Sequence, residues 1–280
     1  MSRVGVWLML SIIVSWRDRM ELARALPQLL ASARAARGDL TIVNYGGSAT
    51  SLCEQTGSLA DDIRIVEVVD DQYFNKGRAH NIGAGLTNQP LLFFCDCDIL
   101  LEPAVVTSLL DEVCATGDSF GTLAGVRESE SNSRNGKHVV CFGYELRIRT
   151  ADGRQLRIID QEEDTEDGTR QAPGLLMVRR SDFLAIGGYN GRLHMYGWGW
   201  DDQDMIARLT LGAGLQRIMR GTAIHLSHDD KARVQAYPMS NRWESRDKMF
   251  RQALDNYDRA DFLGTYETDT EHLSREANDD

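Results

Sequence analysis

The stretch LMLSIIVSW, residues 8–16, is a nearly continuous run of apolar side chains. This pattern is typical of a strand that is covered on both faces in a parallel sheet. The run overlaps an apolar opening segment, residues 4–14, which is shorter than the roughly 20 residues that a membrane span needs. No small-residue cleavage pattern follows it. We therefore expect a buried first strand and a chain that does not span a membrane.

Predicted strands and helices alternate from this strand to about residue 115. Residues 20–36 place their leucines on one helical stripe, and Pro103 opens another helix. The remaining expected elements of this region are strands at 40–45, 63–69 and 91–95 and a helix at 76–86. Such alternation predicts an α/β fold with a parallel sheet, whose ligand binds beyond the carboxyl ends of the strands.

Composition and charge fit a globular protein. The chain has 280 residues, 42% of them apolar and 26% charged, which is enough for one large domain. Its formal net charge of −11 argues against a nucleic-acid partner. The negative charge is concentrated in residues 160–167 and 267–280, so the rest of the chain can still bind an anionic ligand. Like-charge runs are typical of solvated segments, and we expect a disordered tail at 267–280.

The cysteines indicate a reducing compartment. There are five, and none forms a C-x-x-C pair, which fits free thiols better than a disulfide framework. We therefore expect a cytoplasmic protein. Cys95 and Cys97 are interpreted as buried small side chains, because no second cysteine pair follows to complete a zinc site.

Asp96 and Asp98 come directly after the apolar strand 91–95. Side chains two residues apart in an extended chain point the same way, and two adjacent carboxylates repel one another unless a cation lies between them. Mn²⁺ or Mg²⁺ would bind these oxygens and those of a diphosphate together. An acidic strand-to-turn transition without a ligand is the alternative.

Two basic segments lie near the same expected edge of the sheet. Arg17 and Arg19 follow the first strand and could hold phosphate or ribose oxygens. Lys76 opens the helix 76–86, where helix-terminal N–H groups attract anions. Exposed arginines and a simple anchored helix start are the alternatives.

The segment MYGWGWDDQD, residues 195–204, combines two tryptophans, two glycines and three carboxylates. Helical spacing of apolar residues begins here, so the aspartates fall in a first helical turn, where the helix dipole stabilises negative charge. Aspartates that only cap a helix, with tryptophans in the core, are the alternative.

His225 and His228 lie three residues apart after an apolar segment. Most such pairs are surface or hydrogen-bonded pairs. Because histidine suits Mn²⁺, either could complete a metal site begun by Asp98, and His228 is the favoured one.

Together these segments resemble the GT-A-fold glycosyltransferases, most closely the β-1,4-galactosyltransferase family and its bacterial relatives. The resemblance covers about residues 11–230. It depends on six blocks in family order: VSWRDR (14–19), FNKGRAHNIG (74–83), FFCDCD (93–98), APGLLMVRRSDF (172–183), GGYNGRLHMYGWGWDDQD (187–204) and HLSH (225–228). It implies a Rossmann-like α/β fold with a mixed, mostly parallel sheet flanked by helices.

The resemblance also implies a reaction and its residues. A sugar (galactose, glucose or an N-acetylhexosamine) would move from a UDP-sugar to a hydroxyl of a glycan or another acceptor, with Mn²⁺ (or Mg²⁺) and with inversion. Asp202 matches the catalytic base. The metal ligands are Asp98 and His228, with His225 as a second candidate. The residues that the resemblance matches to donor binding are Arg17, Arg19, Asp96 and Trp198, and Lys76 is a further candidate from its position at the start of the helix 76–86.

Three positions depart from the galactosyltransferase pattern. Trp200 stands where the family has a second glycine, Asp201 replaces a glutamate, and Gln203 replaces an aspartate that helps to bind the acceptor. A non-catalytic nucleotide- or sugar-binding protein on the same scaffold is therefore an alternative. A sugar nucleotidyltransferase is weaker, because no glycine-rich, lysine-bearing phosphate loop follows the first strand.

The expected organisation is one domain at residues 1–266, followed by the acidic tail. Within it, 1–126 would bind the nucleotide-sugar, 127–171 would form variable loops, and 172–266 would bind the acceptor and carry the catalytic base. The alternation of predicted strands and helices ends after residue 126, and the next expected strand is at 172–178.

Overall fold

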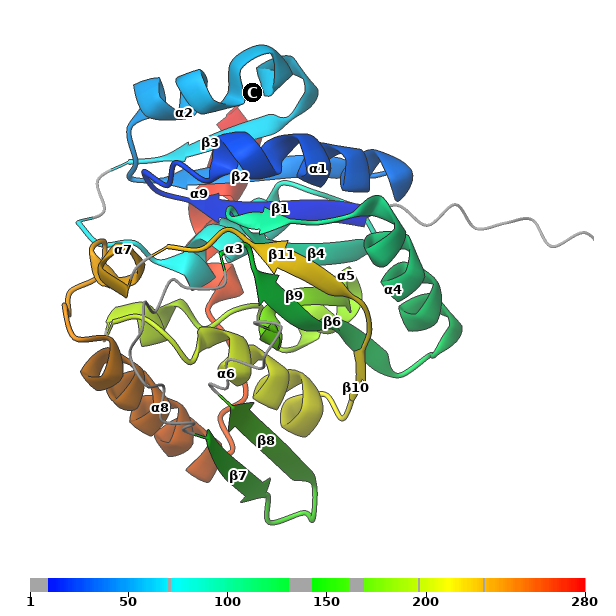
Figure 1. The fold of residues 1–280 in the computed structure, drawn as a ribbon. Coiled ribbons are helices and arrows are strands. Elements are labelled where there is room, and N and C mark those ends of the chain that lie inside the picture. The colour runs from blue at the N-terminus through cyan, green and yellow to red at the C-terminus, as the bar shows by residue number, and fades with distance from the viewer. Residues whose placement is uncertain are drawn as a thin grey trace, which may run out of the picture.

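The computed structural model describes residues 10–69, 72–130, 143–161, 169–195, 197–228 and 230–279. Within this part of the chain a nine-stranded sheet forms the centre of the molecule, in the order β3-β2-β1-β4-β9-β6-β11-β5, with β10 also paired to β6 (Figure 1). The strands are β1 (Leu10–Trp16), β2 (Asp39–Tyr45), β3 (Arg64–Val68), β4 (Leu91–Asp96), β5 (Ile99–Leu100), β6 (Ser119–Glu128), β9 (Thr169–Arg179), β10 (Gln216–Met219) and β11 (Thr222–His225).

The sheet is mixed and mostly parallel, as expected. Strands β3, β2, β1 and β4 run parallel, and β6 runs parallel to β10 and β11. The antiparallel pairings are β4 with β9, β6 with β9, and β5 with β11. Every residue of β1 is buried, which agrees with an apolar strand in the interior of a parallel region. Residues 8 and 9 of the expected strand lie outside the described residues.

Helices cover both faces of the sheet. Ile12 and Val14 of β1 pack with helices α1 and α4 on one face, whereas Ile13 between them packs on the other face with α6. This alternation follows from the period of two in a strand. The helices are α1 (Leu22–Ala35), α2 (Ala49–Thr56), α3 (Lys76–Gly85), α4 (Pro103–Ala115), α5 (Arg180–Ala185), α6 (Asp201–Ala207), α7 (Asp230–Val234), α8 (Arg242–Asp258) and α9 (Tyr266–Asp279), with short helical turns at Gly57–Asp62, Gly191–Met195 and Arg208–Gly212.

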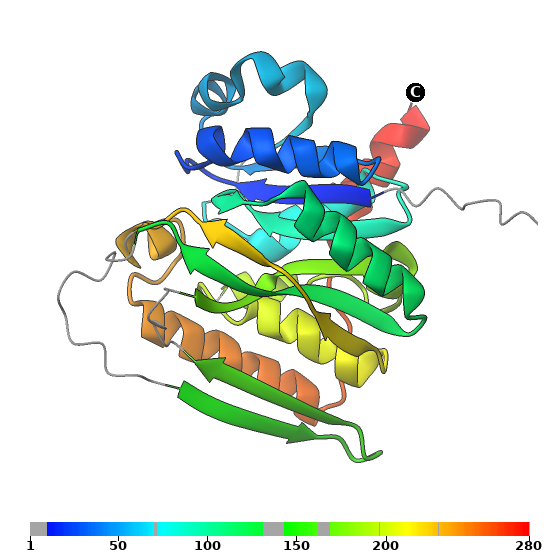
Figure 2. The ribbon, with the colours of Figure 1, turned by 45° about the vertical axis from the view of Figure 1, so that its right-hand side comes forward.

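The expected variable loops contain a hairpin. Strands β7 (Gly143–Arg149) and β8 (Gln155–Gln161) form a separate two-stranded sheet. Its apolar face packs with α8 and with Trp200, so α8 and the hairpin add a further layer outside α6 (Figure 2). Residues 131–142 and 162–168, which include most of the first acidic run, lie outside the described residues.

The prediction of a disordered acidic tail is wrong for the residues described. Helix α9 occupies Tyr266–Asp279 and lies beside α3. Asp269 is buried, and its Oδ2 atom accepts hydrogen bonds from Asn81 at 2.7 Å and Thr265 at 2.6 Å. A run of charge does not exclude order when a buried carboxylate within it has its hydrogen bonds satisfied.

No helix among the described residues combines the length and the hydropathy that crossing a membrane requires.

Candidate active site

A cavity of about 280 Å³ opens beyond the carboxyl ends of β1 and β4. Its walls come from segments that are distant in the sequence: the ends of these strands, the start of α3, strand β9, the start of α6, the loop after β11, and the first turn of α8. This position agrees with the rule that α/β sheets bind ligands beyond the carboxyl ends of their parallel strands.

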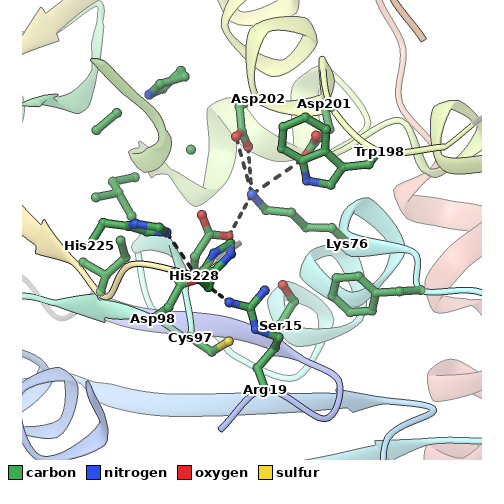
Figure 3. A pocket seen from close by; sticks show the side chains of 18 of the residues that line it. Ser15, Arg19, Lys76, Cys97, Asp98, Trp198, Asp201, Asp202, His225 and His228 are labelled. Carbon is green, nitrogen blue, oxygen red and sulfur yellow. Dashed lines mark hydrogen bonds and ion pairs between the residues drawn. The ribbon is translucent and has the colours of Figure 1, made fainter. Parts of the chain in front are cut away.

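Asp98, His225 and His228 form one cluster at the floor of this cavity (Figure 3). The Nε2 atoms of His225 and His228 lie 3.5 Å and 3.2 Å from Oδ2 of Asp98. Antiparallel pairing of β5 with β11 places His225 opposite Ile99, and the backbone N–H of Leu226 donates to the Asp98 carbonyl at 2.8 Å. Backbone pairing therefore brings together residues more than one hundred positions apart.

The cluster fits a divalent transition metal. Its three potential ligand atoms lie within 4.8 Å of one another. The second Asp98 oxygen, Oδ1, is buried and has no hydrogen-bond partner among the described residues, so it is available to a cation. Burial alone would raise the pKa of Asp98, but hydrogen bonds from both histidines hold it well below its usual range. An ionised carboxylate with two imidazoles suits Mn²⁺ better than Ca²⁺.

Glu128 orients His225 and was not anticipated from the sequence. Its Oε2 atom lies 2.8 Å from Nδ1 of His225, which leaves Nε2 directed at Asp98. Ser227 and Arg170 also hydrogen-bond to Glu128, at 2.8 Å and 2.9 Å. Carboxylates behind metal-binding histidines commonly fix the ring in this way. The contact depends on the parallel register of β6 and β11, which no local pattern indicates.

On the side of the cavity away from Asp98 and the histidines, the ammonium group of Lys76 forms ion pairs with three carboxylates. Its Nζ atom lies 2.9 Å from Oδ1 of Asp96, 3.1 Å from Oδ1 of Asp202 and 3.7 Å from Oδ2 of Asp201 (Figure 3). Burial lowers the pKa of Lys76, but the three carboxylates raise it well above its usual value. The ammonium group is therefore charged, and it links the end of β4 to the start of α6.

Asp202 lies in the first turn of α6, and 23% of its side chain is exposed. Burial and the neighbouring Asp201 raise the pKa of Asp202 to about 7, against the opposing effect of Lys76. A carboxylate with this pKa can both accept and release a proton near neutral pH. Gly174 in β9 makes room for it, because a Cβ there would lie 2.5 Å from Oδ2 of Asp202.

Trp198 and Trp200 have different environments. Trp198 is half-buried at the cavity wall, and its backbone carbonyl accepts a hydrogen bond from Ser245 of α8 at 3.1 Å. Trp200 is buried, and its ring meets Phe250 edge-on with 4.6 Å between centroids. The backbone of Trp200 has a φ of 64°, in the left-handed region that favours glycine. The glycine that the family resemblance implies at this position therefore has a conformational reason.

Arg17 and Arg19 reach the cavity from the end of β1. Arg19 binds Glu21 through two hydrogen bonds of 3.0 Å and 3.1 Å, and its Nη2 atom lies 3.3 Å from Oδ2 of Asp98. The Nη2 group of Arg17 donates to the carbonyl of Gln72 at 3.2 Å. Arg19 therefore connects the end of β1 to the cluster of Asp98, His225 and His228, hereafter the metal-type cluster.

The structure brings all the sequence-predicted site residues to one cavity, while their individual roles remain predictions. The residues concerned are Arg17, Arg19, Lys76, Asp96, Asp98, Trp198, Asp202, His225 and His228. No sequence pattern indicated Glu128, which supports His225 from behind, or Gly174 and two arginines of α8, which line the cavity. Cys95 and Cys97 are buried, and burial raises the pKa of both thiols well above its usual value, as expected for packed side chains.

Residues 159–229, which include α6, β11 and both histidines, match a family model described as the N-terminal domain of galactosyltransferase. The resemblance to the galactosyltransferases is confirmed. No curated protein sequence matches the chain significantly.

The galactosyltransferase-like chain also matches a solved structure, "Crystal structure of GalNAc-T7 with UDP, GalNAc and Mn2+". The TM-score is 0.58 at 12% sequence identity, and the match covers 90% of this chain. It covers 48% of the other chain, so this chain spans about half the length of that structure. At such low identity the likeness shows the fold, which is the GT-A glycosyltransferase fold.

Proposed function

We propose that the protein is a metal-dependent inverting glycosyltransferase. It moves galactose, glucose or an N-acetylhexosamine from a UDP-sugar to a hydroxyl of a glycan or another acceptor. The observation that carries this proposal is one cavity with Asp98, His225 and His228 on its floor and Asp202 opposite, bound to Lys76. The galactosyltransferase family match supports it, as does a shared fold with a GalNAc-T7 structure that contains UDP, GalNAc and Mn²⁺.

The donor side contains the metal-type cluster and two arginines. Asp98, His225 and His228 would hold Mn²⁺ or Mg²⁺, which when bound stabilises negative charge on a diphosphate leaving group. Arg17 and Arg19 bind nucleotide oxygens from the end of β1. Asp96 faces the ribose and sugar of the donor, and Lys76 holds that carboxylate in place.

Asp202 is the base of a single displacement. It accepts the proton of the acceptor hydroxyl, whose oxygen forms a bond to the anomeric carbon. The bond from that carbon to the β-phosphate oxygen breaks at the same time, and UDP leaves with the electron pair. Attack from the face opposite the leaving group inverts the anomeric centre, and no covalent enzyme intermediate is needed. Trp198 supports the sugar rings beside this carboxylate.

These roles assign the donor side and the acceptor side to different parts of the chain. Residues 1–126 supply Asp98 and the basic residues of the donor side, and residues 172–266 supply Asp202, the acceptor side and the two histidines of the metal-type cluster. A cytoplasmic location remains a prediction from the five cysteines, and fractionation of the native host would test it.

A donor screen by UDP release tests the proposal. Release should require Mn²⁺ and be abolished by EDTA and by Asp98→Ala. Asp202→Asn should lower kcat by about 10²- to 10⁴-fold, the usual contribution of a general base, while Mn²⁺-dependent UDP binding is kept. Asp247→Asn, at an exposed ion pair with Arg251, is the matched control and should behave as wild type. The product's anomeric configuration, read by NMR, tests inversion.

Three results would contradict the proposal. Wild-type turnover by Asp202→Asn would remove the base assignment. Metal-dependent UDP binding without turnover on a broad acceptor panel would favour a non-catalytic binding protein. Pyrophosphate release from UTP and a sugar phosphate would indicate a nucleotidyltransferase.

A further inference from the structure

Three aspartates from two elements surround the ammonium group of Lys76, the first residue of α3. Asp96 ends β4, and Asp201 and Asp202 open α6. The Nζ atom of Lys76 lies 2.9 Å from Oδ1 of Asp96 and donates to both carboxylate oxygens of Asp202, at 3.1 Å and 3.4 Å (Figure 3). One cation therefore holds both oxygens of the proposed base.

The helix start that carries Lys76 is anchored to the rest of the fold. Lys76 is buried, and Asn75 caps α3 through its side chain. The side-chain amide of Asn75 donates to the carbonyl of Gly191 at 2.9 Å, which ties the start of α3 to the segment before α6. The backbone of β9 at Gly174 approaches Asp202 so closely that a Cβ there would clash with its carboxylate. Contacts from α3 and β9 together therefore fix the place of this carboxylate.

Among the described residues, Lys76 is the cation that pairs with Asp202. The two other aspartates around the ammonium group add negative charge, and Asp204 of α6 is buried in the core. Tyr189 and Tyr237 approach from neighbouring segments, and burial raises the pKa of both hydroxyls well above its usual value, so both are neutral. Two arginines of α8 line the same cavity, yet Asp202 forms no ion pair with them in the part of the chain that the structure describes. The charge balance at Asp202 therefore depends on Lys76.

The neighbours of Asp202 have opposite effects on its protonation. Burial and the nearby carboxylates favour the protonated form, whereas the ammonium group favours the ionised form. A general base must be ionised before the acceptor hydroxyl arrives. We infer that Lys76 is a positioning residue that acts through Asp202, holding the base ionised and in a fixed place at the cavity. The inference rests on the proposed function and deepens it, and this role differs from the donor contact that the sequence suggested for Lys76.

The pH dependence of turnover in Lys76→Met tests this role. For the wild type and the variant, kcat is measured across neutral and alkaline pH at saturating donor, acceptor and Mn²⁺. Without the cation the base loses its proton only at higher pH, so the limb near pH 7 should move upwards by at least about one pH unit. A shift of one unit lowers kcat at neutral pH about fivefold, and kcat should recover as the pH rises. Loss of a merely structural contact would lower kcat at every pH.

Three further variants separate charge from packing. Lys76→Arg keeps the positive charge and should leave the limb close to its wild-type position. Lys248→Met removes an exposed lysine that pairs with Glu244 on α8, and this control should behave as wild type. Lys76→Met combined with Asp201→Asn removes one charge of each sign, so the limb should return towards its wild-type position. This double variant keeps the net charge of the cluster and takes the place of Lys76→Met if that protein does not fold.

An unchanged limb in Lys76→Met would overturn the inference and leave the proposed function intact, and a higher donor KM in that variant would indicate a donor contact instead. Loss of kcat at every pH in the double variant would also overturn it. If no donor supports turnover, the proposed function fails. Carbon NMR of isotope-labelled aspartate carboxyl groups, with Asp202 assigned through Asp202→Asn, then decides the inference separately. A titration midpoint of Asp202 that rises by at least about one pH unit in Lys76→Met supports it, and an equal midpoint overturns it.

Discussion

At the scale of single residues, the surroundings of Asp202 suit the proton transfer that we propose for it. Asp96, Asp201 and Asp202 all meet the same ammonium group, yet their environments differ. Burial and the nearby Asp201 raise the pKa of Asp202, whereas Lys76 favours its ionised form and limits the rise. The balance leaves a carboxylate that titrates close to neutral pH, which suits a general base.

The pH dependence of turnover should report this carboxylate. A base must be deprotonated to act, so kcat at saturating donor and Mn²⁺ should rise as the pH increases through about 7. Asp201→Asn removes a negative neighbour and should move this limb to lower pH. Asp247→Asn, at the protein surface, is the control and should leave the profile in place. An unchanged limb in Asp201→Asn would show that another group titrates.

At the scale of elements, helix α9 secures the helix that carries Lys76. Asn81 of α3 donates to Asp269 of α9 and to the carbonyl of Tyr189, and it accepts from the N–H of Tyr189. Leu273 of α9 packs against the apolar cluster beneath α3. The acidic C-terminal segment is therefore part of the support of the cavity.

Removal of the buried carboxylate of α9 should destabilise the fold. Asp269→Ala leaves the amide of Asn81 and the hydroxyl of Thr265 without this partner, and the expected cost is about 1–3 kcal/mol. Urea denaturation followed by circular dichroism would measure the free energy of unfolding. Glu267→Ala, at an exposed position of the same helix, is the control and should change it by less than about 0.5 kcal/mol. Equal effects of both changes would argue that α9 does not depend on this contact.

At the scale of the whole molecule, the metal-type cluster joins two distant parts of the chain. Asp98 follows β4, whereas His225 and His228 lie at the end of β11, on the far side of β9 and β6 in the sheet order. A cation bound to all three residues would stabilise the native arrangement of these strands, because the unfolded chain has no such site.

Mn²⁺ should therefore raise the melting temperature. At a concentration of about 100 times Kd the stabilisation is about 2.7 kcal/mol, which corresponds to about 5–10 °C for a domain of this size. Asp98→Ala should abolish the rise in differential scanning fluorimetry. Glu128→Gln should require at least about tenfold more Mn²⁺ for half of it, since Glu128 orients His225. A rise that persists in Asp98→Ala would place the cation elsewhere.

Much of the first half of the fold could be predicted because its signals are local. The apolar runs of β1 and β4 and the helical stripe of α1 follow from periodicity within each segment. The short strands β5, β10 and β11 and the hairpin β7–β8 were missed or left indefinite. Their pairing depends on partners far away in the sequence, and their own patterns are short. The acidic charge of the last residues predicted disorder. In the structure, Leu273 packs α9 against the apolar cluster beneath α3, and Asp269 accepts a hydrogen bond from Asn81 of α3.

The sequence by itself determined three sets of chemical groups in the site: the Asp96–Asp98 pair, the histidines of HLSH, and the aspartates after the Gly-Trp-Gly-Trp segment. It did so because the blocks that hold them are contiguous and ordered along the chain. Only the tertiary structure decided that Glu128 supports His225, that Lys76 binds Asp202, and that Arg242 of α8 lies beside the ring of Trp198. These contacts arise from strand register and helix packing between segments that are distant in the chain, and no spacing within one segment can encode them.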